Sequence, residues 1–140
     1  MAFCIDASAL IPFLLPEQPP TQAIREFWAN ALRRRDRLVT PPLLFAETTS
    51  VLRRYVHSGA IAQNHAVASL QQLFRLPLSV IHHESVYIRA LELAEHLGLA
   101  RAYDVQYLAV AEMEDCSLVT LDRRLYESAR TLGIAACVPQ

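Results

Sequence analysis

Five short apolar runs, each too short for a helix, alternate with longer stretches of helical periodicity along this chain. The runs are β-branched or otherwise apolar, which predicts buried strands. We expect strands at residues 2–5, 37–40, 78–82, 117–121 and 135–138. We expect helices at residues 7–15, 21–34, 41–57, 62–75, 84–97, 104–115 and 122–132. This alternation predicts an α/β fold, in which a central, mostly parallel sheet is covered by helices on both faces.

The composition is that of one folded domain over residues 1–140, without an internal repeat. The chain is 53% hydrophobic with a formal net charge of −1, so any binding of phosphate has to be local. All thirteen basic residues are arginine, which excludes the lysine of a P-loop. Gly59, Gly98 and Gly133 each follow a predicted helix, and no further glycine exists for a dinucleotide-binding loop.

The N-terminal sequence and the spacing of the cysteines predict the cellular compartment of the protein. A signal peptide requires basic residues before its apolar segment, and none precedes the apolar start of this chain. No apolar run is long enough to span a membrane. Cys4, Cys116 and Cys137 are odd in number and lack C-x-x-C spacing, which indicates small core residues in a reducing compartment. We therefore expect a cytoplasmic protein without a membrane segment.

Several segments have two interpretations. The apolar stretch at 9–16 is either core or a patch covered by a second copy or a partner's amphipathic segment. The arginines of RRRDR, 33–37, suit a helix end better than an RNA-binding role. His82 and His83 fall in a predicted strand, where neighbours point to opposite faces, so they cannot bind one metal together. PEQPP, 16–20, is expected to be a loop.

Four acids lie in or beside the apolar runs: Asp6, Glu47, Asp104 and Asp122. Each of the three aspartates stands where a predicted helix begins, so each has a structural explanation as an N-cap. Glu47 lies inside a predicted helix and is bordered by apolar residues at helical spacing. A half-buried carboxylate needs a partner, and Arg54, seven residues on, is the nearby candidate.

A shared site explains all four acids together. Asp6 and Asp122 end predicted strands, and ligands of open parallel sheets bind at the carboxyl ends of the strands. Two carboxylates about 5 Å apart repel by roughly 3 kcal/mol at an effective dielectric constant near 20, so a cluster of four requires a cation. Mg²⁺ and Mn²⁺ prefer carboxylate and water oxygens. Such a site lowers the pKa of a bound water and neutralises a phosphodiester transition state, as in metal-dependent nucleases.

The motifs around these acids resemble those of a known family. They are CIDAS near the N-terminus, TPPLLFAETTSVLRR in the first half, AYDVQYLAVAE late in the chain and LVTLDRRL shortly after. Their order and spacing resemble the PIN domain, especially the VapC-like toxins of bacterial toxin–antitoxin pairs, over essentially the whole chain. The resemblance implies a PIN-like three-layer α/β/α sandwich and a ribonuclease that uses Mg²⁺ or Mn²⁺ to cut RNA by attack of water on phosphorus.

The resemblance also implies a role for each residue that matches its motifs. Asp6 and Asp104 match the direct metal ligands, and Glu47 and Asp122 match acids that hold metal-bound waters or a second ion. Small hydroxyls at Ser8 and Thr120 match positions that orient the carboxylates. Three further residues close to the acids in sequence are candidates for phosphate binding, with solvated helix ends as the alternative: Arg101, Arg123 and Arg124.

The predicted function is therefore a metal-dependent ribonuclease with an RNA substrate, a homodimeric state and a cognate antitoxin. Two alternatives stay open on the residues alone. One is a PIN-like RNA-binding or scaffold module without turnover, which would bind RNA equally with and without a divalent ion. The other is a metal-dependent phosphatase or DNA nuclease that uses the same acids, which a comparison of RNA, DNA and phosphomonoester substrates would identify.

Overall fold

A fully parallel sheet forms the centre of the molecule, as seen in a computed structural model that describes residues 1–17 and 22–139. Its five strands are β1 (Ala2–Ile5), β2 (Arg37–Thr40), β3 (Leu78–Val80), β4 (Ser117–Val119) and β5 (Ala136–Cys137). They lie in the order β3-β2-β1-β4-β5, and every neighbouring pair is parallel. The direction of the strand order therefore reverses between β1 and β4.

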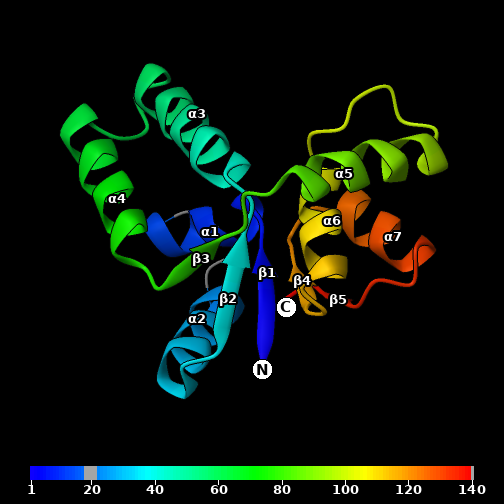
Figure 1. Ribbon diagram of the computed structural model, residues 1–140. Coiled ribbons are helices and arrows are strands. Elements are labelled where there is room, and N and C mark those ends of the chain that lie inside the picture. Colours follow the sequence, from blue (N-terminus) through cyan, green and yellow to red (C-terminus); the bar gives the residue numbers. More distant parts are fainter. Residues whose placement is uncertain (18–21, 140) are drawn as a thin grey trace.

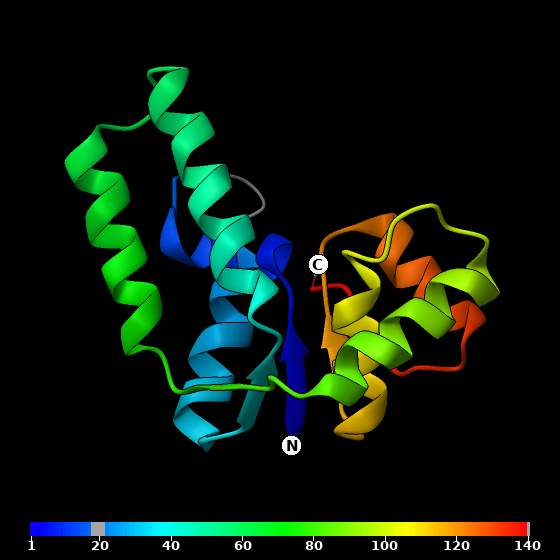
Figure 2. The same cartoon turned by 45° about the horizontal axis from the view of Figure 1, so that its top comes forward.

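Seven helices cover the two faces of the sheet within the described residues. Their bounds are α1 (Ala7–Leu14), α2 (Gln22–Arg34), α3 (Leu43–His57), α4 (Gln63–Arg75), α5 (Glu84–Leu97), α6 (Val105–Met113) and α7 (Arg123–Thr131). Helices α1 to α4 lie on one side of the sheet and α5 to α7 on the other (Figures 1 and 2). The predicted three-layer α/β/α architecture with a central parallel sheet is confirmed.

The predicted element boundaries are slightly too long. The strands predicted at 78–82, 117–121 and 135–138 are shorter, at Leu78–Val80, Ser117–Val119 and Ala136–Cys137. His82 and His83 consequently lie outside β3, and His83 is instead the N-cap of α5, where its ring accepts a hydrogen bond from the Ser85 amide. Residues 18–20 of the predicted PEQPP loop and Thr21, the predicted start of the second helix, lie outside the described residues.

The core explains two features of the sequence that had alternative interpretations. Apolar residues on nearly every side of α6 are buried, because this helix packs on β1 and β4 from one side and against α5 from the other. The apolar stretch at 9–16 is also core, since Leu10, Leu14 and Leu15 are buried within the chain itself. The alternative, that this stretch is a patch awaiting a partner, is therefore wrong.

Two arginines of the segment at 33–37 form ion pairs, one within the segment and one with a distant residue. Arg34 pairs with Asp36 at 2.7 Å, and Arg37 pairs with Glu114 at 2.6 Å. Arg33 and Arg34 form part of the last turn of α2, where the helix dipole favours cations. The structural interpretation of this segment agrees with these contacts. Among the described residues, no helix is both long and apolar enough to cross a membrane.

Candidate active site

The reversal of strand order between β1 and β4 creates the place where a parallel sheet binds ligands. Asp6 directly follows β1, and Asp122 lies three residues after the end of β4. Because β1 and β4 pair in parallel, their carboxyl ends lie at the same edge of the sheet. This topology brings together two acids that are more than a hundred residues apart in sequence.

Asp6 is held by a set of hydrogen bonds that leaves its carboxylate a single orientation. Its Oδ1 accepts from the Ser8 hydroxyl at 2.7 Å and from the Ala9 amide at 2.9 Å, and its Oδ2 accepts from the Thr120 hydroxyl. The bond from Ala9 also makes Asp6 the N-cap of α1. The capping and site interpretations of Asp6 are therefore compatible, because one carboxylate serves both.

The two hydroxyls that orient Asp6 are themselves fixed by the chain after β4. Ser8 Oγ accepts from the Leu121 amide at 2.8 Å, and Thr120 Oγ1 accepts from the Asp122 amide at 2.9 Å. A hydroxyl that accepts from a backbone amide is left to point its own proton at the carboxylate. Ser8 and Thr120 thus tie β1, α1 and the β4–α7 connection to one carboxylate.

Burial makes the charged form of Asp6 energetically unfavourable. Its side chain is only 4% exposed, and this burial is the main reason that its pKa is raised to about 6, with the Asp122 charge adding to the effect. The three hydrogen bonds act in the opposite direction but do not cancel the burial. A buried carboxylate with hydrogen bonds but no counterion is stabilised in its charged form by any cation placed beside it.

Asp122 and Asp104 both precede helices, but they differ in whether the side chain caps the helix. Asp122 is a true N-cap of α7, since its side chain accepts from the amides of Arg124 and Leu125 at 2.9 and 3.3 Å. Asp104 occupies the N-cap position of α6 but accepts no capping hydrogen bond, and its backbone is already helical. The capping explanation is therefore wrong for Asp104, which leaves its carboxylate without a structural task.

Glu47 has a different partner from the one that its helical spacing suggested. The buried Tyr107, on α6, donates its hydroxyl proton to Glu47 Oε1 at 3.1 Å. No ion pair joins Glu47 to Arg54, and both residues are among those that the structure describes. Sequence reasoning missed Tyr107, although a hydroxyl three residues after Asp104 in an otherwise apolar helix was a visible signal.

The charges of the four acids act on one another. Burial raises the pKa of Glu47, and the charges of Asp104, Asp6 and Asp122 raise it further, against the effect of the Tyr107 hydrogen bond. Burial likewise raises the pKa of Asp104, with a contribution from Asp122. None of the four forms an ion pair with an arginine within the described part of the chain. The acids therefore form one electrostatic centre without a protein counterion.

This centre fits a hard divalent ion by the chemistry of its donors. All four side chains are carboxylates, which Mg²⁺ and Mn²⁺ prefer, and their mutual repulsion favours a cation among them. Over residues 1–17 and 22–139, no three acidic, histidine or cysteine side chains are already gathered closely enough to enclose an ion. This spacing agrees with Mg²⁺ binding, which uses one or two carboxylates and retains several waters.

Comparison with known proteins gives this acidic centre a family. The model of the PIN domain matches residues 3–130, which include all four acids. The chain belongs to the PIN domain family. It is also similar to Ribonuclease VapC3 of Pyrobaculum aerophilum, with 31% identity over 129 residues that cover 91% of this chain and 94% of the relative. The predicted resemblance to VapC-like PIN domains is confirmed.

Solved structures show the same PIN-like fold. PAE2754 from Pyrobaculum aerophilum superposes with a TM-score of 0.73 at 21% identity, over 99% of this chain and 89% of that one. VapBC2 from Rickettsia felis, solved bound to a DNA fragment from the promoter of its own genes, superposes with a TM-score of 0.71 at 13% identity over the whole of both chains. At these identities the likeness concerns the fold alone.

Two hollows flank the acidic centre of this PIN domain. The larger has a volume of about 550 Å³ and is lined by Arg101 and Arg124 as well as by Tyr103 and Asp104. The smaller, of about 360 Å³, lies between α3 and the start of α6 and contains Glu47 in its wall. Arg123 is exposed at the start of α7 and lines neither of these two hollows.

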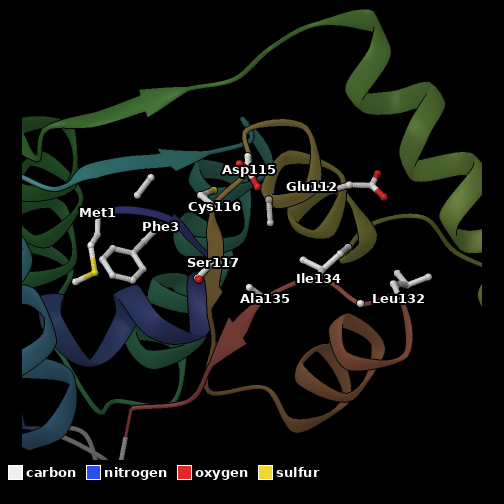
Figure 3. Close-up of a pocket in the computed structure, with 12 residues that line it drawn as sticks. Met1, Phe3, Glu112, Asp115, Cys116, Ser117, Leu132, Ile134 and Ala135 are labelled. Carbon is white, nitrogen blue, oxygen red and sulfur yellow. The ribbon is translucent and has the colours of Figure 1, made fainter.

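A further hollow lies away from the acids. It has a volume of about 530 Å³, and Figure 3 shows Phe3, Ser117 and Ala135 in its wall. Phe3 and Ser117 belong to the first halves of β1 and β4, so this hollow opens at the amino edge of the sheet, opposite the carboxyl edge. It is therefore not part of the acidic centre.

Proposed function

We propose that this PIN domain is a Mg²⁺- or Mn²⁺-dependent ribonuclease that cuts RNA phosphodiester bonds by attack of water on phosphorus, and that it is the toxin of a toxin–antitoxin pair. The observation that carries the proposal is that the charges of Asp6, Glu47, Asp104 and Asp122 act on one another, and that none of the four pairs with an arginine among the described residues. Similarity to a protein named Ribonuclease VapC3 supports RNA as the substrate.

Each side chain has a role in this proposal. Asp6 and Asp104 bind the ion directly, and Glu47 and Asp122 hold its waters or a second ion. A bound divalent ion supplies positive charge opposite the phosphate and lowers the pKa of the attacking water. Ser8 and Thr120 keep the Asp6 carboxylate in one orientation through their hydrogen bonds. Tyr107 positions Glu47 in the same way from α6.

The test is cleavage of labelled single-stranded RNA by the purified protein with Mg²⁺, with Mn²⁺ and in EDTA. We expect cutting with either ion and none in EDTA. Undiminished cutting in EDTA would refute the role of the metal. Binding of RNA without cutting under all conditions would favour a scaffold module, and faster turnover of DNA or of a phosphomonoester would favour the other nuclease or phosphatase alternative.

We also propose that the protein acts in the cytoplasm as a homodimer that binds a cognate antitoxin. Large apolar side chains are exposed on α4 and α5, among them Phe74 at 66% and Leu91 at 68% exposure, and such side chains favour association. The similarity of fold to VapBC2 supports an antitoxin partner.

Light scattering that finds a monomer at every concentration would contradict the dimer, and a co-purification without any small partner would contradict the antitoxin. Recovery of the protein outside the cytoplasmic fraction would contradict its location.

A further inference from the structure

Tyr103 is the most exposed aromatic side chain beside the acidic centre. Its side chain is 61% exposed, although it directly precedes Asp104. Its ring stacks on no other aromatic ring, and its hydroxyl forms no hydrogen bond, among the described residues. Neither aromatic stacking nor a hydrogen bond within the described residues therefore accounts for an aromatic ring at this position.

The two hollows beside the centre meet at Tyr103 and Asp104, which line both of them. The smaller hollow is mostly apolar, with Leu43, Ala46 and Ser50 of α3 in its wall. Its volume of about 360 Å³ is at the lower end of the range for pockets that hold small planar ligands. The ring of Tyr103 thus borders a mostly apolar slot, whose polar groups are the Ser50 hydroxyl and the carboxylates of Glu47 and Asp104.

The larger hollow, on the other side of Tyr103, carries positive charge on a lining that is otherwise largely apolar. Arg101 and Arg124 both line it, and neither forms an ion pair within the described residues. Guanidinium groups that have no carboxylate partner are suited to bind phosphate oxygens. A cationic hollow and an apolar slot therefore flank the same carboxylate.

This alternation corresponds to the chemical pattern of a nucleic-acid strand, in which charged phosphates and flat apolar bases follow one another. Single-stranded RNA is recognised by stacking of unpaired bases on aromatic side chains and by cationic contacts to the backbone. Carboxylates and phosphates are both repelled by the four acids, so charge alone does not separate an acidic peptide from RNA. The mostly apolar slot beside the two arginines favours RNA, because it can accept a flat base next to a bound phosphate.

We infer that Tyr103 stacks on an unpaired base in the slot beside α3, while Arg101 and Arg124 hold a neighbouring phosphate. This inference rests on the proposed ribonuclease function and narrows its substrate to RNA whose base next to the cut is unpaired. Ser50 lies in the wall of the slot, where its hydroxyl is a hydrogen-bonding group for the edge of the base. Double-stranded RNA is disfavoured, because a paired base must first be unpaired and unstacked at a cost in free energy.

The decisive experiment compares a probe that has bases with one that has none. Fluorescein-labelled oligo(A) and inorganic polyphosphate are bound to the Asp104→Asn protein in Mg²⁺, so that no turnover occurs. Tyr103→Leu in this background is expected to weaken oligo(A) binding about 5- to 150-fold, the range for loss of one stacked base, and to leave polyphosphate binding unchanged. Tyr103→Phe keeps the ring and is expected to bind oligo(A) as the parent does.

Two further variants complete the design. A double change of Arg101 and Arg124 to Gln is expected to weaken both probes, because phosphate contacts do not depend on a base. Tyr87→Leu is the matched control, since Tyr87 is an exposed tyrosine of α5 that lines neither hollow, and it is expected to change nothing. In turnover assays of the chain with Asp104 intact, Tyr103→Leu is expected to slow cutting of single-stranded RNA to a similar degree.

The outcomes separate the inference from the proposed function. Equal binding of oligo(A) by the Tyr103→Leu and parent proteins would overturn the inference, even if the wild-type protein cuts RNA. Loss of binding to both probes in Tyr103→Leu would overturn it as well, because a stacking role affects only the probe with bases. A change of oligomeric state in Tyr103→Leu, with RNA binding intact, would assign the surface to a protein partner instead. Failure of the wild-type protein to cut any RNA would refute the proposed function itself.

Discussion

At the scale of single residues, Asp104 differs from the other two aspartates of the centre because it has no structural task. Asp6 and Asp122 each cap a helix, whereas the Asp104 carboxylate accepts no capping hydrogen bond. Its pKa is nevertheless raised by burial and by the charge of Asp122. A carboxylate that is destabilised and contributes nothing to the helix is explained most simply by a ligand.

Asp104→Asn should therefore separate function from stability. We expect cleavage to be lost, while the free energy of unfolding of the metal-free protein changes by less than about 0.5 kcal/mol or increases, because repulsion is relieved. Added Mn²⁺ should raise the melting temperature of the wild type more than that of the variant. Calorimetry with and without Mn²⁺, together with the cleavage assay, measures all three effects.

Asp115→Asn is the matched control for this prediction. Asp115 follows α6 at its other end and has a left-handed backbone with φ of 49°, which asparagine adopts as readily as aspartate. This variant should keep both its cleavage activity and its stabilisation by Mn²⁺. If Asp104→Asn behaves like Asp115→Asn in both assays, Asp104 is not part of the metal site.

Tyr107→Phe tests whether the tyrosine positions Glu47. The change removes the hydroxyl that donates to Glu47 and keeps the buried ring. Because this hydrogen bond holds the pKa of Glu47 down, its loss should raise that pKa further. We expect slower cleavage, by roughly tenfold, and an acid limb of the pH–rate profile that moves to higher pH. A uniform loss of rate with an unmoved profile would indicate a purely structural role. Tyr126→Phe, at a tyrosine of α7, serves as the control.

At the scale of elements, the buried Asp6 carboxylate at the junction of β1, α1 and β4 lowers the stability of the folded protein by an amount that depends on pH. Burial raises the pKa of Asp6 from its ordinary value of 3.8 to about 6. Between these two values the folded protein binds more protons than the unfolded chain, so stability falls as pH rises through this window. At neutral pH the cost is roughly 3 kcal/mol, from about 1.4 kcal/mol per unit of pKa.

Metal-free wild type should therefore gain stability relative to Asp6→Asn as the pH is lowered from 7 to 5. The asparagine cannot titrate, so any constant change in its hydrogen bonds cancels from the pH dependence. Urea unfolding of both proteins in EDTA at several pH values measures the difference. Asp36→Asn should show no such gain, because Arg34 lowers the pKa of Asp36 instead. A difference between wild type and Asp6→Asn that does not vary with pH would contradict a charged, buried Asp6.

The elements also show what the sequence could predict and what it could not. Strands were predictable as short apolar runs, and helices from the 3.6-residue period of their apolar residues. The same runs placed Asp6 and Asp122 after the ends of β1 and β4. The end of β3 was less accurate because the chain continues apolar through Ile81, whose amide still donates to the Thr40 carbonyl at 2.9 Å beyond the last paired residue, Val80. The bond of Tyr107 to Glu47 joins residues sixty positions apart on two helices, and only tertiary packing brings them together.

At the scale of the whole molecule, RNA binding has to arise from a few local charges. The formal net charge is −1, and several of the thirteen arginines are already committed to ion pairs, including Arg34, Arg37 and Arg89. Long-range attraction to a polyanion is therefore weak. The acidic centre adds local repulsion, which a divalent ion offsets. Affinity must depend on Arg101 and Arg124, on the stacked base and on the bound ion.

This balance predicts a shallow dependence of RNA binding on salt. Each phosphate that a protein neutralises on a single strand contributes a slope of about −0.7 in a plot of log K against log salt, so the one phosphate held by Arg101 and Arg124 gives about −0.7. The slope can be measured by titrating labelled oligo(A) against the Asp104→Asn protein at several KCl concentrations in constant Mg²⁺.

Changing Arg101 and Arg124 to Gln should reduce the slope to near zero, because these two side chains carry the phosphate contacts. Changing Arg33 to Gln should leave it unaltered, since Arg33 hydrogen-bonds to Asn30 at the end of α2, away from the two hollows. A slope several times steeper, or one that responds to Arg33, would mean that the RNA also follows the basic end of α2 and that binding is not confined to the acidic centre.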